Sequence, residues 1–255
     1  MVREDLRKLY LTAMGIQAWE RRGLPVEAGI AAAAEHRGSA TLSDASSEGS
    51  GEESQTRMPQ PAANTESPGM AGMDWGGLEQ AVRGCSRCRL HEGRTHTVFG
   101  TGNRRARWMF VGEAPGAEED RQGEPFVGRA GQLLNSMLYA TGLGRDEVYI
   151  ANVIKCRPPN NRDPLPDEVQ QCEPYLLRQI GLIQPRLIVA LGRHAAHSLL
   201  KTELALGKLR GQSLNYHGIP LIVTYHPAYL LRNPADKRKA WEDLRRARKL
   251  VETVP

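Results

Sequence analysis

Apolar and polar positions follow two different periods along the chain after residue 74. Short apolar runs bounded by Gly, Pro or polar residues are typical of strands buried on both faces, and they occupy residues 108–111, 148–152, 187–191 and 221–224. Between them, apolar residues recur at the spacing of amphipathic helices, at residues 75–82, 131–140, 167–183, 194–200 and 236–251. Strands alternating with helices predict an α/β fold, a three-layer α/β/α domain with a mainly parallel central sheet over residues 74–255.

The first 73 residues have a different pattern. Residues 38–73 are poor in large apolar side chains and rich in Ser, Gly, Pro and Glu, which predicts a disordered linker. Residues 1–37 form an extension in which Leu6, Leu9 and Tyr10 stand at helical spacing. We expect a short amphipathic helix there. It either packs back on the main domain or docks, through residues 6–22, in a groove of a partner protein.

The net charge bears on the kind of partner that the protein binds. The formal net charge of the chain is +5, and the linker carries five acidic residues against one basic residue, so the remainder carries +9. Such an excess favours an anionic partner such as nucleic acid, although a solvated basic surface gives the same sum. The sequence contains no apolar stretch of membrane-spanning length and no secretory signal, so we expect a cytoplasmic protein with no membrane contact.

Four cysteines fall in the α/β region. Cys85 and Cys88 form a CxxC pair, and Cys156 and Cys172 follow at a distance. Four are too few for a disulfide scaffold of this size, so they are available as thiolate ligands. Tetrahedral zinc and a [4Fe-4S] cluster both suit four thiolates. A redox CxxC pair usually opens a helix after a strand, and that context is missing.

Polar motifs follow the strands at their carboxyl ends, where open α/β sheets form their binding crevice. They are GEAPG at 112–116, PFVG at 125–128, NVIKCRPP at 152–159 and HPAYLLR at 226–232. In this order and with the four cysteines, they resemble the family 4 uracil-DNA glycosylases, the thermostable iron-sulfur type. The resemblance covers residues 74–250. Each motif alone is weak, whereas the ordered set is specific.

The resemblance implies a function and a cofactor. It implies a bacterial monofunctional uracil-DNA glycosylase, which hydrolyses the N-glycosidic bond of a flipped-out deoxyuridine in DNA and leaves an abasic site for base excision repair. It places a structural [4Fe-4S] cluster on Cys85, Cys88, Cys156 and Cys172. It implies a monomer whose partner is uracil-containing DNA, held at the nucleoid through that DNA. The N-terminal peptide resembles that of the psi subunit of the DNA polymerase III clamp loader, which implies a replication or repair partner.

The same resemblance assigns roles in uracil binding. Phe126 offers a flat face for stacking, unless it is an ordinary core residue. Asn152 carries one donor and one acceptor, which match the O4 and N3 hydrogen of uracil, although Asn at a strand end also caps turns. His226 can donate to uracil O2 as charge builds on the leaving base. The full expected uracil-binding set is Gly112, Glu113, Ala114, Gly116, Phe126, Asn152 and His226.

The position of the attacking water is less well defined by the motifs. The GEAPG motif lacks the Asp that activates water in the best-known uracil glycosylases. Glu113, Glu119 and Asn161 match positions that the family uses, and a carboxylate there can also stabilise a cationic sugar. With His226 they form the expected catalytic set. The other histidines considered, His194, His197 and His217, are expected to be surface or capping residues.

DNA contact is expected at the last motif. Apolar side chains of this segment could fill the gap left by the flipped nucleotide while the arginine meets phosphate, or the leucines could belong to the core. The residues concerned are Tyr229, Leu230, Leu231 and Arg232. The final helix has a basic side that either contacts phosphates or is simply solvated.

Two other functions are compatible with parts of the pattern. One is a non-catalytic iron-sulfur module that binds nucleic acid or senses oxidation. The other is a related glycosylase with altered base specificity, including relatives that form a covalent adduct with DNA. Intact Phe126, Asn152 and His226 argue against the first. The adduct-forming relatives carry an extra basic, His-containing loop where this chain has only PPNNRDPLP.

Overall fold

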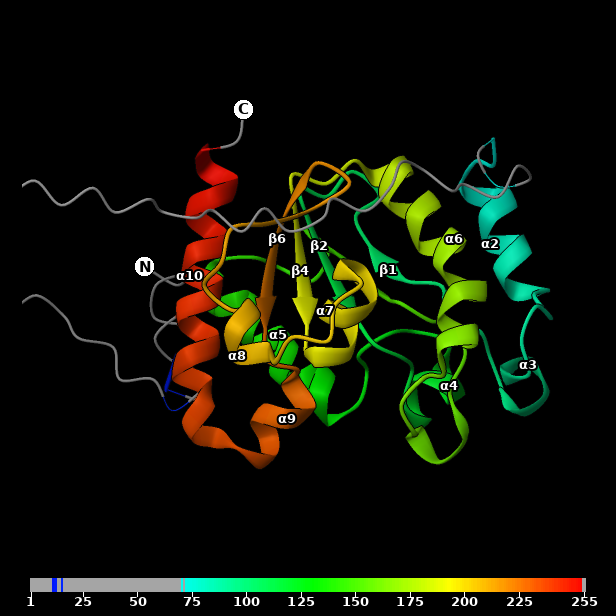
Figure 1. Cartoon of the computed structure of the whole chain (residues 1–255), viewed down its shortest axis with the longest axis horizontal. Helices are drawn as coiled ribbons and strands as arrows, with labels where there is room; N and C mark the ends of the chain where they lie inside the picture. Colours follow the sequence, from blue (N-terminus) through cyan, green and yellow to red (C-terminus); the bar gives the residue numbers. More distant parts are fainter. Residues whose placement is uncertain (1–10, 13–14, 16–69, 71, 254–255) are drawn as a thin grey trace, which may run out of the picture. The chain divides into compact units, whose positions relative to one another are not determined.

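The computed structural model describes residues 11–12, 15, 70 and 72–253 (Figure 1). The predicted extension and linker therefore lie almost wholly outside the described residues, as does most of the proposed docking helix. Among the described residues, no helix is both long and apolar enough to cross a membrane.

A six-stranded sheet forms the centre of the domain. Its order is β1-β3-β2-β4-β6-β5. The four inner strands are parallel, and the two short edge strands run antiparallel to their neighbours. The strands are β1 (Thr101–Gly102), β2 (Trp108–Gly112), β3 (Tyr149–Asn152), β4 (Leu187–Leu191), β5 (Leu214–Tyr216) and β6 (Ile219–Thr224). The four predicted strands are thus confirmed as the inner strands.

Helices cover both faces of this sheet, which confirms the three-layer α/β/α architecture. The helices are α2 (Trp75–Arg83), α3 (Leu90–Gly93), α4 (Ala117–Gln122), α5 (Arg129–Thr141), α6 (Pro166–Ile183), α7 (Arg193–Leu200), α8 (Leu206–Leu209), α9 (Pro227–Arg232) and α10 (Lys237–Thr253), with 3-10 turns η1 (Pro159–Asn161) and η2 (Pro234–Asp236). Buried residues of α2, α6 and α7 pack on one face of the sheet. Those of α5, α9 and α10 pack on the other. Figure 1 shows β2, β4 and β6 side by side in the middle of the domain.

The continuous apolar runs of the inner strands follow from this arrangement. Successive side chains point to opposite faces of a sheet, and both faces here are covered. In β2, Met109 and Val111 pack against the first helix layer, while Trp108 and Phe110 pack against the second. All five residues of β2 are buried. Neither face needs polar side chains, so the strand lacks the polar alternation of a half-exposed one.

The parallel strands bring their carboxyl ends to one edge of the sheet. Gly112 at the end of β2 lies beside Asn152 at the end of β3, and Leu191 of β4 lies beside Thr224 of β6. The segments that follow these four residues contain every predicted polar motif except PFVG. The fold therefore gathers the motifs at the edge where doubly wound sheets form a crevice.

Candidate uracil-binding pocket and cysteine cavity

A pocket of about 760 Å³ opens at the carboxyl edge of the sheet. Its walls come from the segments after β2, β3, β4 and β6 and from the loop before α5. The lining includes most of the predicted site residues, namely Glu113, Ala114, Gly116, Glu119, Phe126, Asn152, Asn161, His226, Tyr229 and Arg232. The fold thus brings together residues that lie up to 119 positions apart in the chain.

Asn152 closes the base of this pocket. The residue is 2% exposed, and its side-chain Oδ1 has no hydrogen-bond partner among the described residues. Buried amide oxygens are normally satisfied, so this atom is ready for a donor on a ligand. The neighbouring Gly112 makes room for it, because an added Cβ there would collide with Oδ1 and lie 2.6 Å from Cζ of Phe126.

Phe126 forms one wall of the pocket from a strained backbone. Its φ is +55°, a left-handed conformation that is rare for a bulky residue. Arg145 holds the strained segment by donating from Nη1 to the Phe126 carbonyl at 3.2 Å and from Nη2 to the carbonyl of Pro125. Gly131 of α5 allows this close approach, since an added Cβ would collide with the Phe126 carbonyl. The ring is 6% exposed.

Glu119 links two of the motifs through the backbone. Its Oε1 accepts from the amides of Val127 and Gly128 at 3.0 and 3.1 Å, and its Oε2 accepts from the amide of Gly116 at 3.1 Å. Both carboxylate oxygens are therefore engaged in holding the 112–116 turn against the 125–128 loop. This geometry gives Glu119 a supporting position behind the pocket wall.

His226 stands at the start of α9 and faces Phe126. Its Nδ1 accepts from the backbone amide of Ala228 at 3.1 Å, capping the helix. Because Nδ1 accepts, the neutral ring carries its hydrogen on Nε2. Burial, with a smaller effect of Arg232, lowers the pKa of His226 to about 4, so the imidazole is neutral at physiological pH. Its ring centroid lies 5.6 Å from that of Phe126.

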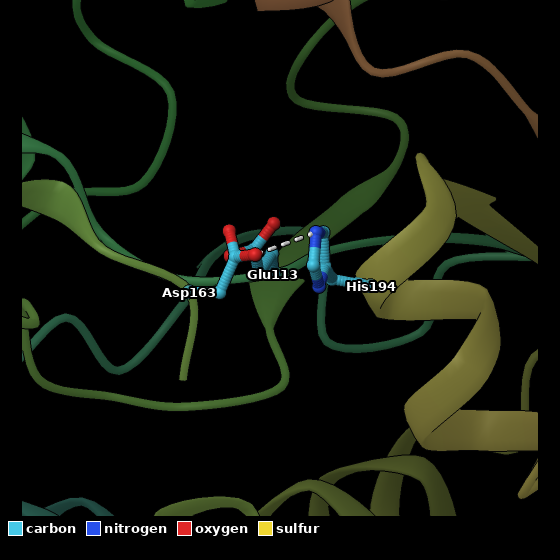
Figure 2. Close-up of side chains that lie close together, drawn as sticks. All are labelled: Glu113, Asp163 and His194. Carbon is cyan, nitrogen blue, oxygen red and sulfur yellow. Dashed lines mark ion pairs between the residues drawn. The ribbon is translucent and has the colours of Figure 1, made fainter. Parts of the chain in front are cut away.

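Glu113 meets two residues that the motifs did not identify. Asp163, from the loop before α6, and His194, in the first turn of α7, place ligand-type atoms within 4.8 Å of one another and of Glu113. Figure 2 shows the three side chains converging, with Asp163 Oδ2 and His194 Nε2 3.3 Å apart. Burial first, and then the charge of Asp163, raise the pKa of Glu113 to about 7, while Arg193 opposes the shift. His194 was expected to be a surface or capping residue; its side chain is 30% exposed, and it lines the pocket because α7 begins directly there.

Asn161 lies on the rim of the pocket. It is exposed, and its Oδ1 accepts from Nε of Arg157 at 2.7 Å. Both Asn160 and Asn161 have positive φ, which Asn tolerates better than most residues. The side chain therefore shapes the rim through its bond to Arg157.

The HPAYLLR segment forms a helix, and this corrects one DNA-contact prediction. Leu230 is 1% exposed and belongs to the core that α5 and α10 form with the sheet, so it is not available to DNA. Leu231 is half-buried against the same core. Tyr229 and Arg232, on another side of α9, line the pocket. The Tyr229 ring stacks on Tyr225, with centroids 5.2 Å apart.

The four cysteines line a second, separate cavity. Cys85 and Cys88 come from the link between α2 and α3, Cys156 follows β3, and Cys172 lies in α6. Hydrogen bonds reach two of the sulfurs, from Arg94 Nη1 to Cys156 at 3.1 Å and from the Lys155 amide to Cys172 at 3.2 Å. Such donors favour thiolate over thiol. Burial acts in the opposite direction and is the largest effect on Cys172, whose pKa is raised to about 12 although Lys155 lowers it.

The spacing of the sulfurs distinguishes between kinds of metal site. Four sulfurs bound to one tetrahedral zinc at 2.3 Å lie about 3.8 Å from one another. Within residues 72–253, which include all four cysteines, the Glu113 group is the only set of three or more such ligand atoms within 4.8 Å of one another. The sulfurs are therefore spread more widely than a single zinc ion requires.

Lys155 connects the cysteine cavity to the pocket. Its Nζ, fully buried, donates to the main-chain carbonyl of Asn152 at 2.9 Å and to Oε1 of Gln179 at 2.7 Å. Its own backbone amide bonds to Cys172. The segment that carries Asn152 is thus fixed from the cysteine side.

Comparison with known proteins agrees with this geometry. Residues 99–245 match the Uracil DNA glycosylase superfamily. The chain is 45% identical over 187 residues to the type-4 uracil-DNA glycosylase of Saccharolobus solfataricus, covering 70% of this chain and 87% of that protein. It is also 45% identical over 178 residues to that of Thermotoga maritima, covering 68% of this chain and 93% of the relative. A type-5 uracil-DNA glycosylase of Pyrobaculum aerophilum is 36% identical over 146 residues, covering 51% of this chain and 64% of the relative. The chain therefore belongs to the uracil-DNA glycosylase superfamily and, within it, to the type-4 uracil-DNA glycosylases.

Proposed function

We propose that this protein is a uracil-DNA glycosylase of base excision repair, which hydrolyses the bond between uracil and deoxyribose and leaves an abasic site. The observation that carries the proposal is the unpaired, buried Oδ1 of Asn152 in a pocket walled by Phe126 and His226. A base must leave the duplex to enter such a pocket. The polar groups that meet the base then decide which base is cut.

Asn152 and Phe126 recognise the base. The Asn152 Oδ1 accepts the N3 hydrogen of uracil while its amide group donates to O4. Cytosine presents the reverse pattern, which leaves the buried oxygen facing an acceptor, a mismatch that buried polar groups reject strongly. Stacking on Phe126 adds about 1–3 kcal/mol without regard to base identity.

His226 stabilises the leaving base. As the glycosidic bond breaks, negative charge builds on the uracil ring and reaches O2. The neutral imidazole donates from Nε2, since its Nδ1 is occupied by the Ala228 amide. A fixed donor aimed at developing charge in a water-poor site contributes about 2.7–4 kcal/mol to transition-state stabilisation.

Glu113 acts as the base for the attacking water, and Glu119 and Asn161 support the pocket. With a pKa of about 7, Glu113 is close to the value at which a general base works best near neutral pH. Glu119 positions the 112–116 turn and the Phe126 loop through its three backbone bonds. Asn161 holds the rim on which the sugar and its phosphates rest.

We propose that Cys85, Cys88, Cys156 and Cys172 hold a [4Fe-4S] cluster. Their common cavity and wide sulfur spacing fit a cluster better than one zinc ion. When bound, the cluster supplies a structural cross-link and no electron, because uracil hydrolysis is not a redox reaction. Lys155 and its bond to the Asn152 carbonyl carry that rigidity into the pocket.

DNA contact falls on the pocket rim. Tyr229 and Arg232 line the mouth, where a ring and a guanidinium can meet the strand beside the flipped nucleotide. The exposed basic residues of α10 extend the positive surface, namely Arg238, Lys239, Arg245, Arg248 and Lys249. Because the substrate is genomic DNA, the proposed setting is the bacterial cytoplasm, where a monomer is held at the nucleoid by DNA.

The test compares wild-type protein with Asn152→Ala on an oligonucleotide containing one uracil, cleaved with alkali after reaction. Wild-type cleavage at uracil and loss in Asn152→Ala support the proposal. Asn215→Ala, at an exposed position of edge strand β5, is the matched control and keeps full activity. Absorption near 400 nm reports the cluster. A folded, coloured protein that leaves uracil intact would refute the proposed function. Release of another deaminated base would make that base the substrate instead of uracil.

A further inference from the structure

The Glu113 carboxylate lies in the pocket without a bonded partner. No described residue forms a hydrogen bond or ion pair with it, although the charges of Asp163 and Arg193 act on it. A second carboxylate nearby makes its ionised form more costly. Two carboxylates that face each other in a half-buried site are stabilised by a cation or a hydrogen-bond donor between them.

The geometry fits a water molecule in that place. The ligand-type atoms of Glu113, Asp163 and His194 are all within 4.8 Å of one another. Three atoms so arranged leave a point no more than about 2.8 Å from each of them, which is the length of an O–H···O hydrogen bond. One oxygen can therefore contact all three side chains.

The loop that carries Asp163 is held firmly. Arg162 donates to both carboxylate oxygens of Glu168 at 2.6 and 2.9 Å and also to the Asp163 carbonyl at 2.9 Å. The Leu165 amide donates to Glu168 at 2.8 Å, and Glu168 is 3% exposed. Asp163 itself remains accessible, with 66% of its side chain exposed. The backbone is fixed while the carboxylate faces the pocket.

We propose that Asp163 is a second acceptor for the attacking water, on a backbone segment that Arg162 holds through its bonds to Glu168 and to the Asp163 carbonyl. This inference rests on the proposed glycosylase function. The water donates one hydrogen to Glu113 and one to Asp163, and a lone pair faces C1′ of the flipped nucleotide. The two carboxylates also face the cationic sugar of the transition state and stabilise its charge.

The water oxygen forms a bond to C1′ while the bond from C1′ to N1 breaks, and its electron pair leaves with uracil. One water proton passes to the Glu113 carboxylate. The other stays on the new hydroxyl of the abasic sugar.

The charged groups around Glu113 predict a pH signature. Asp163 from the loop before α6 raises the pKa of Glu113, and Arg193 from α7 lowers it. His194, also from α7, has its own pKa lowered, first by burial, so it is neutral where the enzyme works. Removing the Asp163 charge therefore lowers the pKa of Glu113 and moves the acidic limb of the rate profile to lower pH.

The experiment measures single-turnover excision against pH for wild type and Asp163→Asn. We expect the variant to be at least about tenfold slower at pH 8, as for a misplaced reactant. The acidic limb of its pH–rate profile should lie at lower pH than that of the wild type. Binding to an oligonucleotide carrying the uncleavable 2′-fluoro-2′-deoxyuridine stays within twofold, because Asn152 and Phe126 are intact. Asp146→Asn, an exposed carboxylate outside the pocket, is the matched control and changes neither measurement.

Other outcomes overturn the inference in distinguishable ways. A wild-type rate and pH profile in Asp163→Asn would remove Asp163 from the water site and leave the glycosylase function standing. Absence of excision by wild type would overturn both. Wild-type activity that is lost with EDTA and restored by Mn²⁺ would assign the three side chains to a metal ion instead. An unchanged melting temperature in Asp163→Asn separates a local effect from unfolding.

Discussion

The shape of the pocket depends on Gly112 having no side chain. The glycine lies under both the Asn152 amide and the Phe126 ring, so the two recognition groups meet over a bare backbone. The motifs drew attention to Asn152, Phe126 and His226, because each stands at a strand end or in a Gly-rich loop. Asp163 and His194 carried no such signal. Their proximity to Glu113 depends on the order of strands in the sheet, which local sequence patterns do not predict.

Gly112→Ala therefore tests recognition without touching a polar group. The new methyl would displace the Asn152 amide or the Phe126 ring, and a displacement of about 1 Å costs on the order of 100-fold in rate. We expect excision to fall by that factor in a folded protein, measured under single-turnover conditions. Gly181→Ala is the control, because nothing lies within 4 Å of its added Cβ and Ala favours the helix. Equal rates for the two variants would contradict this account of the pocket.

The buried His226 makes the stability of the protein depend on pH. Its pKa is about 4 in the fold and about 6.5 in the unfolded chain, so between these values the unfolded state binds more protons. Stability is then constant above pH 6.5 and falls as the pH drops towards 4, by up to about 3 kcal/mol. Urea unfolding of wild type and His226→Gln at several pH values measures this, and the variant should lose that part of the dependence. Parallel curves would show that the imidazole is not buried as described.

At the scale of elements, the sequence was most informative where an element is buried on both faces. The inner strands were predicted because each is a continuous apolar run. The edge strands β1 and β5 escaped prediction because they have two and three residues, too few for a period. Helix α9 was missed because His226 and Pro227 suggested a loop. Pro at the first helical position and a capping side chain before it are in fact starting signals of a helix.

Asp243 links helix α10 to strand β6 and to Arg210 at the end of α8. Asp243, 6% exposed, accepts from Nε and Nη2 of Arg210 at 2.7 and 3.0 Å and from Thr224 Oγ1 of β6 at 2.8 Å. Truncation of one partner leaves the other charge uncompensated. We expect Asp243→Ala to lower the free energy of unfolding by about 2–4 kcal/mol, below the full range because Arg210 can partly reach solvent.

Chemical denaturation measures this change. The control is Glu252→Gln on the same helix, which breaks only the exposed pair with Arg248 and should cost no more than about 0.5 kcal/mol. If the two variants were equally stable, the buried contacts of Asp243 with Arg210 and Thr224 would not be what holds α10 in place.

The whole molecule contains two sites that share one segment. Residues 152–156 carry Asn152 into the pocket and Cys156 into the cysteine cavity, with Lys155 bonded towards both. The sequence showed the four cysteines and the motifs but not this connection, because the Gln179 that completes it lies 24 residues further on, in α6. The cavity and the pocket are thus parts of one rigid unit.

The surface charges of the whole molecule also affect DNA binding. Arg232 lines the pocket mouth and is exposed, so we expect it to contact a phosphate near the flipped nucleotide. Each phosphate neutralised contributes about 0.9 to the slope of log K against log salt concentration. Arg232→Ala should therefore weaken binding at low salt and reduce that slope by about 1, as measured by titration of a labelled, uncleavable oligonucleotide.

Lys249→Ala provides the comparison, because it removes the same charge from the far part of α10. Position 249 is twelve residues beyond Lys237, where the helix begins, and at 1.5 Å per residue this places it about 18 Å along the axis. That distance exceeds the Debye length of about 8 Å at physiological ionic strength, so its charge adds little at the mouth. An unchanged slope for Lys249→Ala and a reduced one for Arg232→Ala would locate the DNA at the mouth. The reverse result would move the contact onto the distal part of α10 and leave Arg232 with a role inside the pocket alone.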